Sequence, residues 1–207
     1  MTPAPKRTAP LESRVATGAD LDALAETMAL AFYADPVWSW AFPDSERRLE
    51  QHRAVWRFAI ESALGYGWVR MADAGAGAAA LWIPPGLPEL KPEDALRFEP
   101  MLAELLGDGA ARVLDVFARF DRAHPSDRPH YYLSLLATHP DRRGVGLGMA
   151  LLAENLTRID AEGAAAYLES TNPDNHRRYE GVGFSRWGEF ELGEGGPTVT
   201  QMWRDPR

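Results

Sequence analysis

Apolar side chains recur along this chain at two spacings, one typical of helices and one typical of strands. Leu21, Leu24 and Met28 lie three or four positions apart, which predicts a helix over residues 18–32. The same spacing predicts helices over about 45–65, within 92–124, after 148 and over 173–180. Short apolar runs bounded by Gly, Pro or Asn predict strands over 13–16, 68–71, 78–83, 130–138, 164–170, 184–192 and 198–203. This order indicates a mixed α/β (α+β) fold with a central sheet of about seven strands.

Three connections between these elements are less regular. Asp35-Pro36 ends the first helix, and we expect the following VWSWAFPD to be an aromatic loop. The Gly- and Ala-rich ADAGAGA predicts a hairpin-like turn between the second and third strands. Residues 92–124 form a helical insertion before the fourth strand, and because Pro100 lacks the amide needed inside a helix, we expect two or three short helices there.

The composition is that of an ordinary globular protein with one domain. We interpret the Pro-rich residues 1–10 as a flexible N-terminal arm and residues 11–207 as a single domain without internal repeats. No apolar run reaches the ~18 residues needed to cross a bilayer, and the arm lacks the apolar stretch of a signal peptide. We therefore expect a cytoplasmic protein with no membrane partner.

Charge and cysteine content exclude some kinds of chemistry. The formal net charge of −8 opposes binding to nucleic acid, because such binding depends on neutralising phosphates with Lys and Arg. The chain has no cysteine, which excludes thiolate metal sites and any mechanism that passes through an acyl-cysteine.

A glycine-rich loop stands where the strand over 130–138 ends and a helix begins. In Arg143-Gly144-Val145-Gly146-Leu147-Gly148, backbone amides and the positive end of the helix dipole meet at one point, which favours a pyrophosphate. A side chain would hold the phosphate oxygens away from the amides, and such a loop can require positive φ. Taken alone, the loop is equally compatible with a tight turn that binds nothing.

Two common phosphate loops do not fit this spacing. The nucleoside triphosphate loop requires Gly-Lys followed by Ser or Thr, and no Gly of this chain precedes a Lys. The dinucleotide fingerprint requires a third small residue where Met149 or Leu151 stands. The pattern that remains is Arg-x-x-Gly-x-Gly.

Two stretches together resemble the GNAT superfamily of N-acetyltransferases. THPDRRGVGLGMALL resembles the family's main coenzyme A motif, and NPDNHRRYEGVGF resembles its second motif. LESTNPDN, YEGVGF and the early FYADPVWSW further resemble the puromycin acetyltransferase-like branch, from which His176-Arg177-Arg178 departs. The resemblance covers nearly the whole chain. It implies the GNAT fold, with a mixed sheet flanked by helices, and an acyl-CoA-dependent N-acyltransferase that uses acetyl-CoA and no metal.

The resemblance also implies where the coenzyme binds. Its pantetheine arm would lie where the parallel strands over 130–138 and 164–170 splay apart, and its amides would bond to backbone groups near 136–138. The two asparagines that follow the second strand would either cap the next helix or bind the coenzyme arm. The residues expected to bind the coenzyme are Leu136, Ala137, Thr138, Arg143, Gly144, Val145, Gly146, Leu147, Gly148, Asn172 and Asn175.

Two residues are candidates for the chemistry at the thioester. Tyr179, inside YEGVGF, resembles the family tyrosine that gives a proton or a hydrogen bond to the leaving sulfur, although a helix tyrosine often serves only in packing. An amine of pKa ~10.4 must lose a proton before it attacks. Glu169 is the candidate base, with a structural salt bridge as its alternative role. His130 has a suitable intrinsic pKa, with a solvated position at the strand end as its alternative.

The acceptor is expected to be an amine, on a small molecule or a peptide. Asp35 and Trp38 follow the first helix, where GNAT enzymes commonly build the acceptor pocket, and a carboxylate among aromatic rings suits an amine. Tyr132 and Ser134 share a strand face that is expected to line the acceptor channel. A homodimer is left open. The competing function is a non-catalytic acyl-CoA-binding regulatory or scaffold domain.

Overall fold

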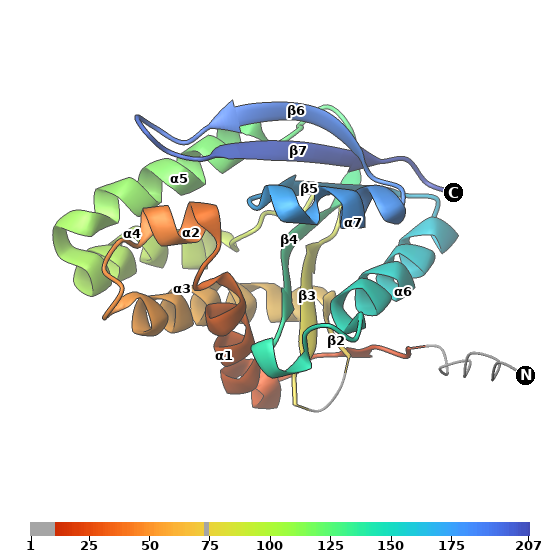
Figure 1. The fold of residues 1–207 in the computed structure, drawn as a ribbon, viewed down its shortest axis with the longest axis horizontal. Coiled ribbons are helices and arrows are strands. Elements are labelled where there is room, and N and C mark those ends of the chain that lie inside the picture. The colour runs from red at the N-terminus through yellow and green to blue at the C-terminus, as the bar shows by residue number, and fades with distance from the viewer. Residues whose placement is uncertain (1–10, 73–74) are drawn as a thin grey trace, which may run out of the picture.

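The computed structural model describes residues 11–72 and 75–207, and a seven-stranded mixed sheet runs through its centre (Figure 1). The predicted N-terminal arm and residues 73–74 of the predicted turn lie outside the described residues. The strands lie side by side in the order β1 (Arg14–Val15), β2 (Val69–Met71), β3 (Ala78–Ile83), β4 (His130–Thr138), β5 (Ala165–Ser170), β7 (Thr198–Arg204) and β6 (Ser185–Glu191). β4 and β5 pair in parallel, and the other neighbours pair antiparallel. The predicted fold class is confirmed.

Helices cover both faces of the sheet, and Figure 1 shows the two groups on opposite sides of β3 and β4. One face carries α1 (Leu21–Phe32), α2 (Pro36–Ala41), α3 (Arg48–Ala63), α4 (Pro92–Leu106) and α5 (Ala110–Ala123). The other face carries α6 (Leu147–Ala161) and α7 (His176–Gly181). Short 3-10 turns cover Gly18–Asp20, Leu64–Tyr66, Gly107–Gly109, Pro140–Arg142 and Pro173–Asn175.

The apolar core is divided by the sheet into two clusters. Met28 of α1 and Trp56 of α3 are fully buried on the first face. Leu152 and Ile159 of α6 are fully buried on the second, against Trp82 of β3. Each such side chain contributes roughly 1.5–3 kcal/mol when it leaves water, so both faces of the sheet are firmly held.

The segment after α1 is a helix, where the sequence predicted a loop. Pro36 occupies the first helical position, where its missing amide costs nothing, and the Asp35 side chain caps the helix. Asp35 Oδ1 accepts hydrogen bonds from the amides of Val37 at 3.0 Å and Trp38 at 3.3 Å. The capping signal that ends α1 therefore also begins α2.

The insertion before β4 consists of two helices, but the chain does not break at the predicted place. Pro100 lies inside α4, and the break falls at the 3-10 turn over Gly107–Gly109. A proline inside a helix leaves the carbonyl four residues earlier without its usual amide donor. That carbonyl belongs to Leu96, which is 81% exposed, so water can replace the missing donor.

The parallel strands β4 and β5 separate partway along their length. Their Cα pairs run from His130 with Ala165 to Leu133 with Leu168 and go no further, although β4 continues to residue 138 and β5 to residue 170. β4 remains paired with β3 along this second half. Its backbone groups on the β5 side therefore lack a strand partner and are available to a ligand.

Ser134 forms a β-bulge in β4 at this point of separation. Leu133 pairs with Trp82 and Leu135 pairs with Leu81, so Ser134 is the extra residue with no Cα partner in β3. The bulge reverses the alternation of side chains. Leu133 packs in the α6 cluster, whereas Leu135 packs in the cluster under α1–α5.

Candidate active site

Three adjoining cavities lie along β4, and two of them border the gap between β4 and β5. The first, the loop groove, has a volume of about 630 Å³ and lies along the glycine loop. The second, the aromatic cavity, has a volume of about 350 Å³ and is enclosed by α1, α2, α3, the insertion and the two strands. The third, the outer cleft, has a volume of about 810 Å³ and is lined by residues 83–89 and 124–130 with Phe120, Asp121 and Tyr132. The aromatic cavity shares lining residues with each of the other two.

The loop groove has the backbone geometry that the glycine pattern predicts. Gly144 and Gly146 have φ values of 83° and 77°, in the left-handed region that favours glycine. α6 begins directly after Gly146, so the amides of its first turn are left without acceptors in the helix. Gly148 is needed for a different reason, because a Cβ there would collide with the Thr138 hydroxyl. The helix can thus begin close beside the open half of β4.

Positive charge gathers at this groove on an otherwise acidic chain. Arg142, Arg143 and Arg178 line it together with two carboxylates, Asp35 and Asp174. The Arg143 guanidinium donates to the carbonyl of Ala31 at 3.2 Å, which ties the loop to α1. A helix N-terminus flanked by arginines suits a ligand that carries phosphate groups.

The predicted coenzyme residues fall into two groups. Most line the loop groove, namely Leu136, Thr138, Arg143, Gly144, Gly146, Leu147, Gly148, Asn172 and Asn175. The Ala137 side chain instead packs in the core under α1–α5, and Val145 is 75% exposed outside the lining. The bulge accounts for the position of Ala137, because it turns the side chains of residues 135 and 137 toward α1–α5 and away from α6.

The two asparagines after β5 take different positions. Asn172 caps the 3-10 turn over Pro173–Asn175, and its Oδ1 accepts from the amide of Asp174 at 3.0 Å. Asn175 lines both the loop groove and the aromatic cavity, and its Oδ1 accepts from the Arg178 guanidinium at 2.8 Å. Asn172 therefore has the capping role that the sequence left open, while its side chain also borders the groove.

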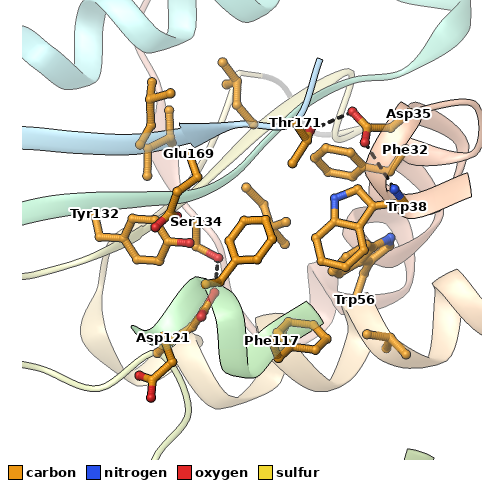
Figure 2. Close-up of a pocket in the computed structure, with 18 of the residues that line it drawn as sticks. Phe32, Asp35, Trp38, Trp56, Phe117, Asp121, Tyr132, Ser134, Glu169 and Thr171 are labelled. Atoms are coloured by element: carbon orange, nitrogen blue, oxygen red, sulfur yellow. Dashed lines mark hydrogen bonds between the residues drawn. The ribbon is translucent and has the colours of Figure 1, made fainter. Parts of the chain in front are cut away.

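Aromatic rings form one wall of the second cavity, as Figure 2 shows. The Trp38 ring lies 4.7 Å from Trp56, 5.6 Å from Phe117 and 6.0 Å from Phe120, measured between centroids. Phe32 completes this wall beside Trp56. Such a wall favours an apolar or aromatic ligand body and also attracts a cation.

The charged groups that line the aromatic cavity are all carboxylates: Asp35, Glu89, Asp121 and Glu169. Figure 2 shows Asp35 with Thr171 at one end, and Glu169 with Tyr132 at the other. Asp35 Oδ2 accepts from the Thr171 hydroxyl at 2.7 Å, and burial raises the pKa of this carboxyl. Acidic groups with no basic partner in the lining suit a cationic ligand.

Glu169 is held by its neighbours and keeps one oxygen free. Its side chain is 1% exposed, and Oε1 accepts from the Tyr167 hydroxyl at 2.8 Å. The Tyr167 oxygen in turn accepts from Gln201 at 3.0 Å. Oε2 is buried and has no hydrogen-bond partner among residues 11–72 and 75–207. A buried carboxylate oxygen without a partner is costly, so it is ready to accept a proton or a donor from a ligand.

A second carboxylate approaches the same end of the cavity from the segment after β3. The Ser134 hydroxyl donates to Glu89 Oε1, and burial, followed by the negative charge of Glu169, raises the pKa of Glu89. Tyr132 lies between these groups. Burial and the charges of Glu169 and Glu89 raise its pKa well above the usual value, so it stays neutral as a donor.

Tyr179 stands where the loop groove meets the aromatic cavity, and it lines both. Its ring packs edge-on against Phe184 with centroids 6.3 Å apart. Burial, with a smaller contribution from the negative charge of Asp35, raises the pKa of Tyr179 to about 12. The hydroxyl is thus protonated throughout the physiological range and has a hydrogen to donate at the junction.

Several lining residues were not predicted from the sequence. Glu89, Phe117 and Phe120 come from the insertion and the segment before it, and the exposed Arg178 of α7 lines the loop groove. Phe117 and Phe120 stand three apart, which marks one helix face without saying what it faces. His130 is buried against Tyr167 and Trp203, so the solvated position considered for it is wrong.

Metal-binding clusters and membrane-spanning helices are both absent from the part of the chain that the structure describes. Over 11–72 and 75–207, no three or more His, Asp or Glu side chains are grouped so that they could hold a metal ion. Within the same ranges, no helix has both the length and the apolar character required to cross a bilayer.

Comparison with known proteins finds similarity to acetyltransferases. Residues 102–184, which include the glycine loop, β5 and Tyr179, match the model described as "Acetyltransferase (GNAT) family". A crystal structure from Corynebacterium glutamicum, titled as histone acetyltransferase HPA2 and related acetyltransferase, is similar at 26% identity and a TM-score of 0.69, over 94% of this chain and 96% of that one. The chain is therefore similar to GNAT acetyltransferases over residues 102–184, and it shares the fold of a solved acetyltransferase along nearly its whole length.

Two further acetyltransferase structures share the fold at lower identity. A mutant of agmatine N-acetyltransferase is 13% identical with a TM-score of 0.67, over 95% of this chain and 100% of that one. The Drosophila melanogaster polyamine N-acetyltransferase, whose title gives N-acetylagmatine as its product, is 14% identical with a TM-score of 0.66, over 94% and 99%. At this identity they support the fold, while placement in the puromycin acetyltransferase-like branch stays a prediction.

Proposed function

We propose that this protein is an N-acetyltransferase that moves an acetyl group from acetyl-CoA to a primary amine with an apolar or aromatic body. The observation that carries this proposal is the junction at Tyr179, where a groove built for phosphates meets a cavity that combines aromatic rings with carboxylates. We propose direct transfer within a complex of both substrates, and the absence of cysteine excludes an acyl-cysteine intermediate.

The loop groove fits coenzyme A in its chemistry. The first turn of α6 and the loop over 143–148 supply backbone amides for the pyrophosphate, and Arg142, Arg143 and Arg178 supply charge. The open half of β4, from Ser134 to Thr138, offers backbone groups to the amides of the pantetheine arm. When bound, acetyl-CoA brings the acyl group as a thioester.

The aromatic cavity suits a small amine. Its volume of about 350 Å³ lies at the lower end of the range for small-molecule sites. Trp38, Phe117 and Phe120 favour an apolar body, and the carboxylates at the two ends favour the ammonium group. The agmatine and polyamine N-acetyltransferases that share the fold are named for small amines, which supports testing agmatine and polyamines first.

Two residues are proposed to handle the protons of the transfer. The free Oε2 of Glu169 takes a proton from the ammonium, directly or through one water, so that the neutral amine can attack the thioester carbonyl. As the carbon–sulfur bond breaks, negative charge develops on sulfur, and the Tyr179 hydroxyl donates to it. The amide that forms is neutral and loses the attraction of the carboxylates.

Thiol release from acetyl-CoA in the presence of an amine panel tests this function. The panel should contain an arylalkylamine, an alkyl diamine, agmatine and a lysine-containing peptide, each with an alcohol of matching shape as the control. We expect release above the hydrolytic background with at least one amine and with none of the alcohols. An affinity for CoA without turnover on any amine would instead support the non-catalytic binding domain.

A further inference from the structure

A pair of histidines lies between the aromatic cavity and the outer cleft. His124 directly follows α5, and His130 opens β4. Both line the outer cleft, and neither lines the aromatic cavity. Their rings lie 4.9 Å apart, and each packs against Tyr167, whose hydroxyl holds Glu169. The pair therefore links the proposed base to a water-accessible surface.

The hydrogen bonds of the pair fix which ring nitrogens carry protons. His130 Nδ1 lies 2.6 Å from the carbonyl oxygen of Arg128, which can only accept, so Nδ1 carries the hydrogen. Burial lowers the pKa of His130, so its ring is neutral at pH 7 and its Nε2 has a lone pair. His124 Nε2 lies 3.1 Å from that Nε2 and must therefore be the donor.

This arrangement leaves the other nitrogen of His124 facing Glu169. His124 Nδ1 lies 3.8 Å from Glu169 Oε1. Since Nε2 carries the hydrogen of this ring, Nδ1 has a lone pair and can accept a proton from the Glu169 side chain once that carboxylate has been protonated. The gap is longer than a hydrogen bond and is closed by a small rotation of the ring or by one bridging water. The His124 side chain is 31% exposed, so a proton it receives can pass on to solvent.

We propose that His124 carries the proton that Glu169 takes from the acceptor amine out to the outer cleft, and that His130 is the positioning residue that orients it. This inference rests on the proposed function. The ammonium gives one proton to the Glu169 carboxylate, the resulting carboxyl gives it to His124 Nδ1, and the imidazolium loses a proton to water. Glu169 and His124 return to their starting states. The second proton of the attacking nitrogen goes to the leaving sulfur, so one proton leaves per acetyl transferred.

Each element that packs against His124 contributes a charged or titratable side chain to its surroundings. β4 contributes His130 and Tyr132, and β5 contributes Tyr167 and Glu169. Glu89 acts from the segment after β3, and Asp121 lies three residues earlier on α5. The nearest charges are thus acidic. His124 also stands at the carbonyl end of α5, where a positive charge is favoured, so a transient imidazolium is stabilised there.

The test compares variants that keep the ring packing and remove the nitrogens. His124→Phe preserves the contacts with Tyr132 and Tyr167, and Ser126→Ala, on the same cleft, is the matched control. Coenzyme affinity, kcat and KM are measured from about pH 6 to 9 in dilute buffer, with and without added imidazole. For His130, the Phe variant is compared with His130→Gln, whose amide oxygen can still accept a hydrogen bond from His124.

We expect His124→Phe to lower kcat by about ten-fold or more at neutral pH with coenzyme affinity unchanged, and we expect imidazole or rising pH to restore the rate. His130→Gln should retain more activity than His130→Phe, and Ser126→Ala should behave as wild type. A wild-type rate for His124→Phe at every pH, or a loss that imidazole and pH do not affect, would overturn the relay.

Failure of the relay is distinguishable from failure of the proposed function. If the wild-type protein releases no thiol with any amine, the proposed function is wrong before any histidine is changed. If the wild-type protein turns over and His124→Phe does too, only the relay is wrong. Nitrogen-15 NMR gives a readout without turnover, because the relay requires the hydrogen of neutral His130 on Nδ1. Finding it on Nε2 would exclude the relay by itself.

Discussion

Replacing Tyr179 by Phe removes one oxygen at the junction of the two cavities. The ring keeps its edge contact with Phe184, and the Tyr179 hydroxyl is a donor in none of the side-chain hydrogen bonds found among residues 11–72 and 75–207. We therefore expect the free energy of unfolding to change by less than the ~1 kcal/mol of a typical hydrogen bond. A loss of activity in this variant cannot then be explained by a loss of fold.

The size of the activity loss depends on what the hydroxyl does. Burial raises the pKa of Tyr179 to about 12, whereas an ordinary thiol has a pKa of ~8.5. Full transfer of the proton to a free thiolate would be uphill by about 3.5 pKa units, or about 5 kcal/mol. If the hydroxyl only donates a hydrogen bond to the developing thiolate, the proton stays on the tyrosine oxygen and this cost does not arise. Hydrogen bonds to charged groups contribute about 1.5–3 kcal/mol. We therefore expect kcat to fall by roughly 10- to 150-fold, since 1.4 kcal/mol is about ten-fold.

The assay is steady-state thiol release with an accepted amine, beside calorimetric CoA affinity for both proteins. Affinity should stay within a few-fold of wild type. A kcat equal to wild type in a chemistry-limited assay would refute the assignment. A loss beyond about 10⁴-fold would contradict the hydrogen-bond argument, because it exceeds what one donor contributes. Equal losses of affinity and rate would make Tyr179 a binding residue instead.

Three further outcomes can be checked. Saturating acetyl-CoA or CoA should raise the melting temperature in thermal scans, since a ligand that binds the native state stabilises it by mass action. If the protein is first freed of any copurified coenzyme and the added coenzyme then leaves the melting temperature unchanged, the coenzyme site is contradicted. Gly146→Asp should abolish calorimetric CoA binding with the fold intact, whereas Gly195→Asp, at a comparable φ of 70° away from the groove, should retain it. Because the folded pKa of Glu89 is raised, wild-type stability should fall as pH rises through that pKa, and denaturant titrations of Glu89→Gln should show a smaller fall.

The local motifs of this chain predicted the backbone geometry of the glycine loop, while the coenzyme site itself stays a prediction. Positive φ at Gly144 and Gly146, and the approach of Gly148 to Thr138, are properties that a short glycine pattern determines by itself. Tyr179 lies four positions after Asn175, the last residue of the turn that Asn172 caps, so its position relative to that turn is also set locally.

The bulge at Ser134 was not predictable, because the sequence pattern shows no interruption. In HYYLSLLAT, Tyr131, Leu133, Leu135 and Ala137 alternate as if they shared one face. In the fold, the first two pack with α6 and the last two with the other helix group. Both faces are apolar, so hydrophobicity could not reveal the change of register.

The acceptor side depends on contacts between segments far apart in the chain. Glu89 meets Ser134, 45 residues later, and Phe117 and Phe120 reach Trp38 across the fold. Propensity indicates that 110–123 is a helix but not which cavity it closes. α2 was missed for a related reason, since Asp35-Pro36 signals both an end and a beginning.

The bulge at Ser134 also gives the protein two independently adjustable specificities on one strand. Leu135 lines the aromatic cavity and Thr138 lines the loop groove, so under the proposed function we expect a mutation at either position to alter recognition of one substrate only. The helices that complete the acceptor wall lie on the face of the sheet opposite the glycine loop. Natural variation or laboratory selection can therefore change the amine repertoire by remodelling α4 and α5, while the donor side stays as it is.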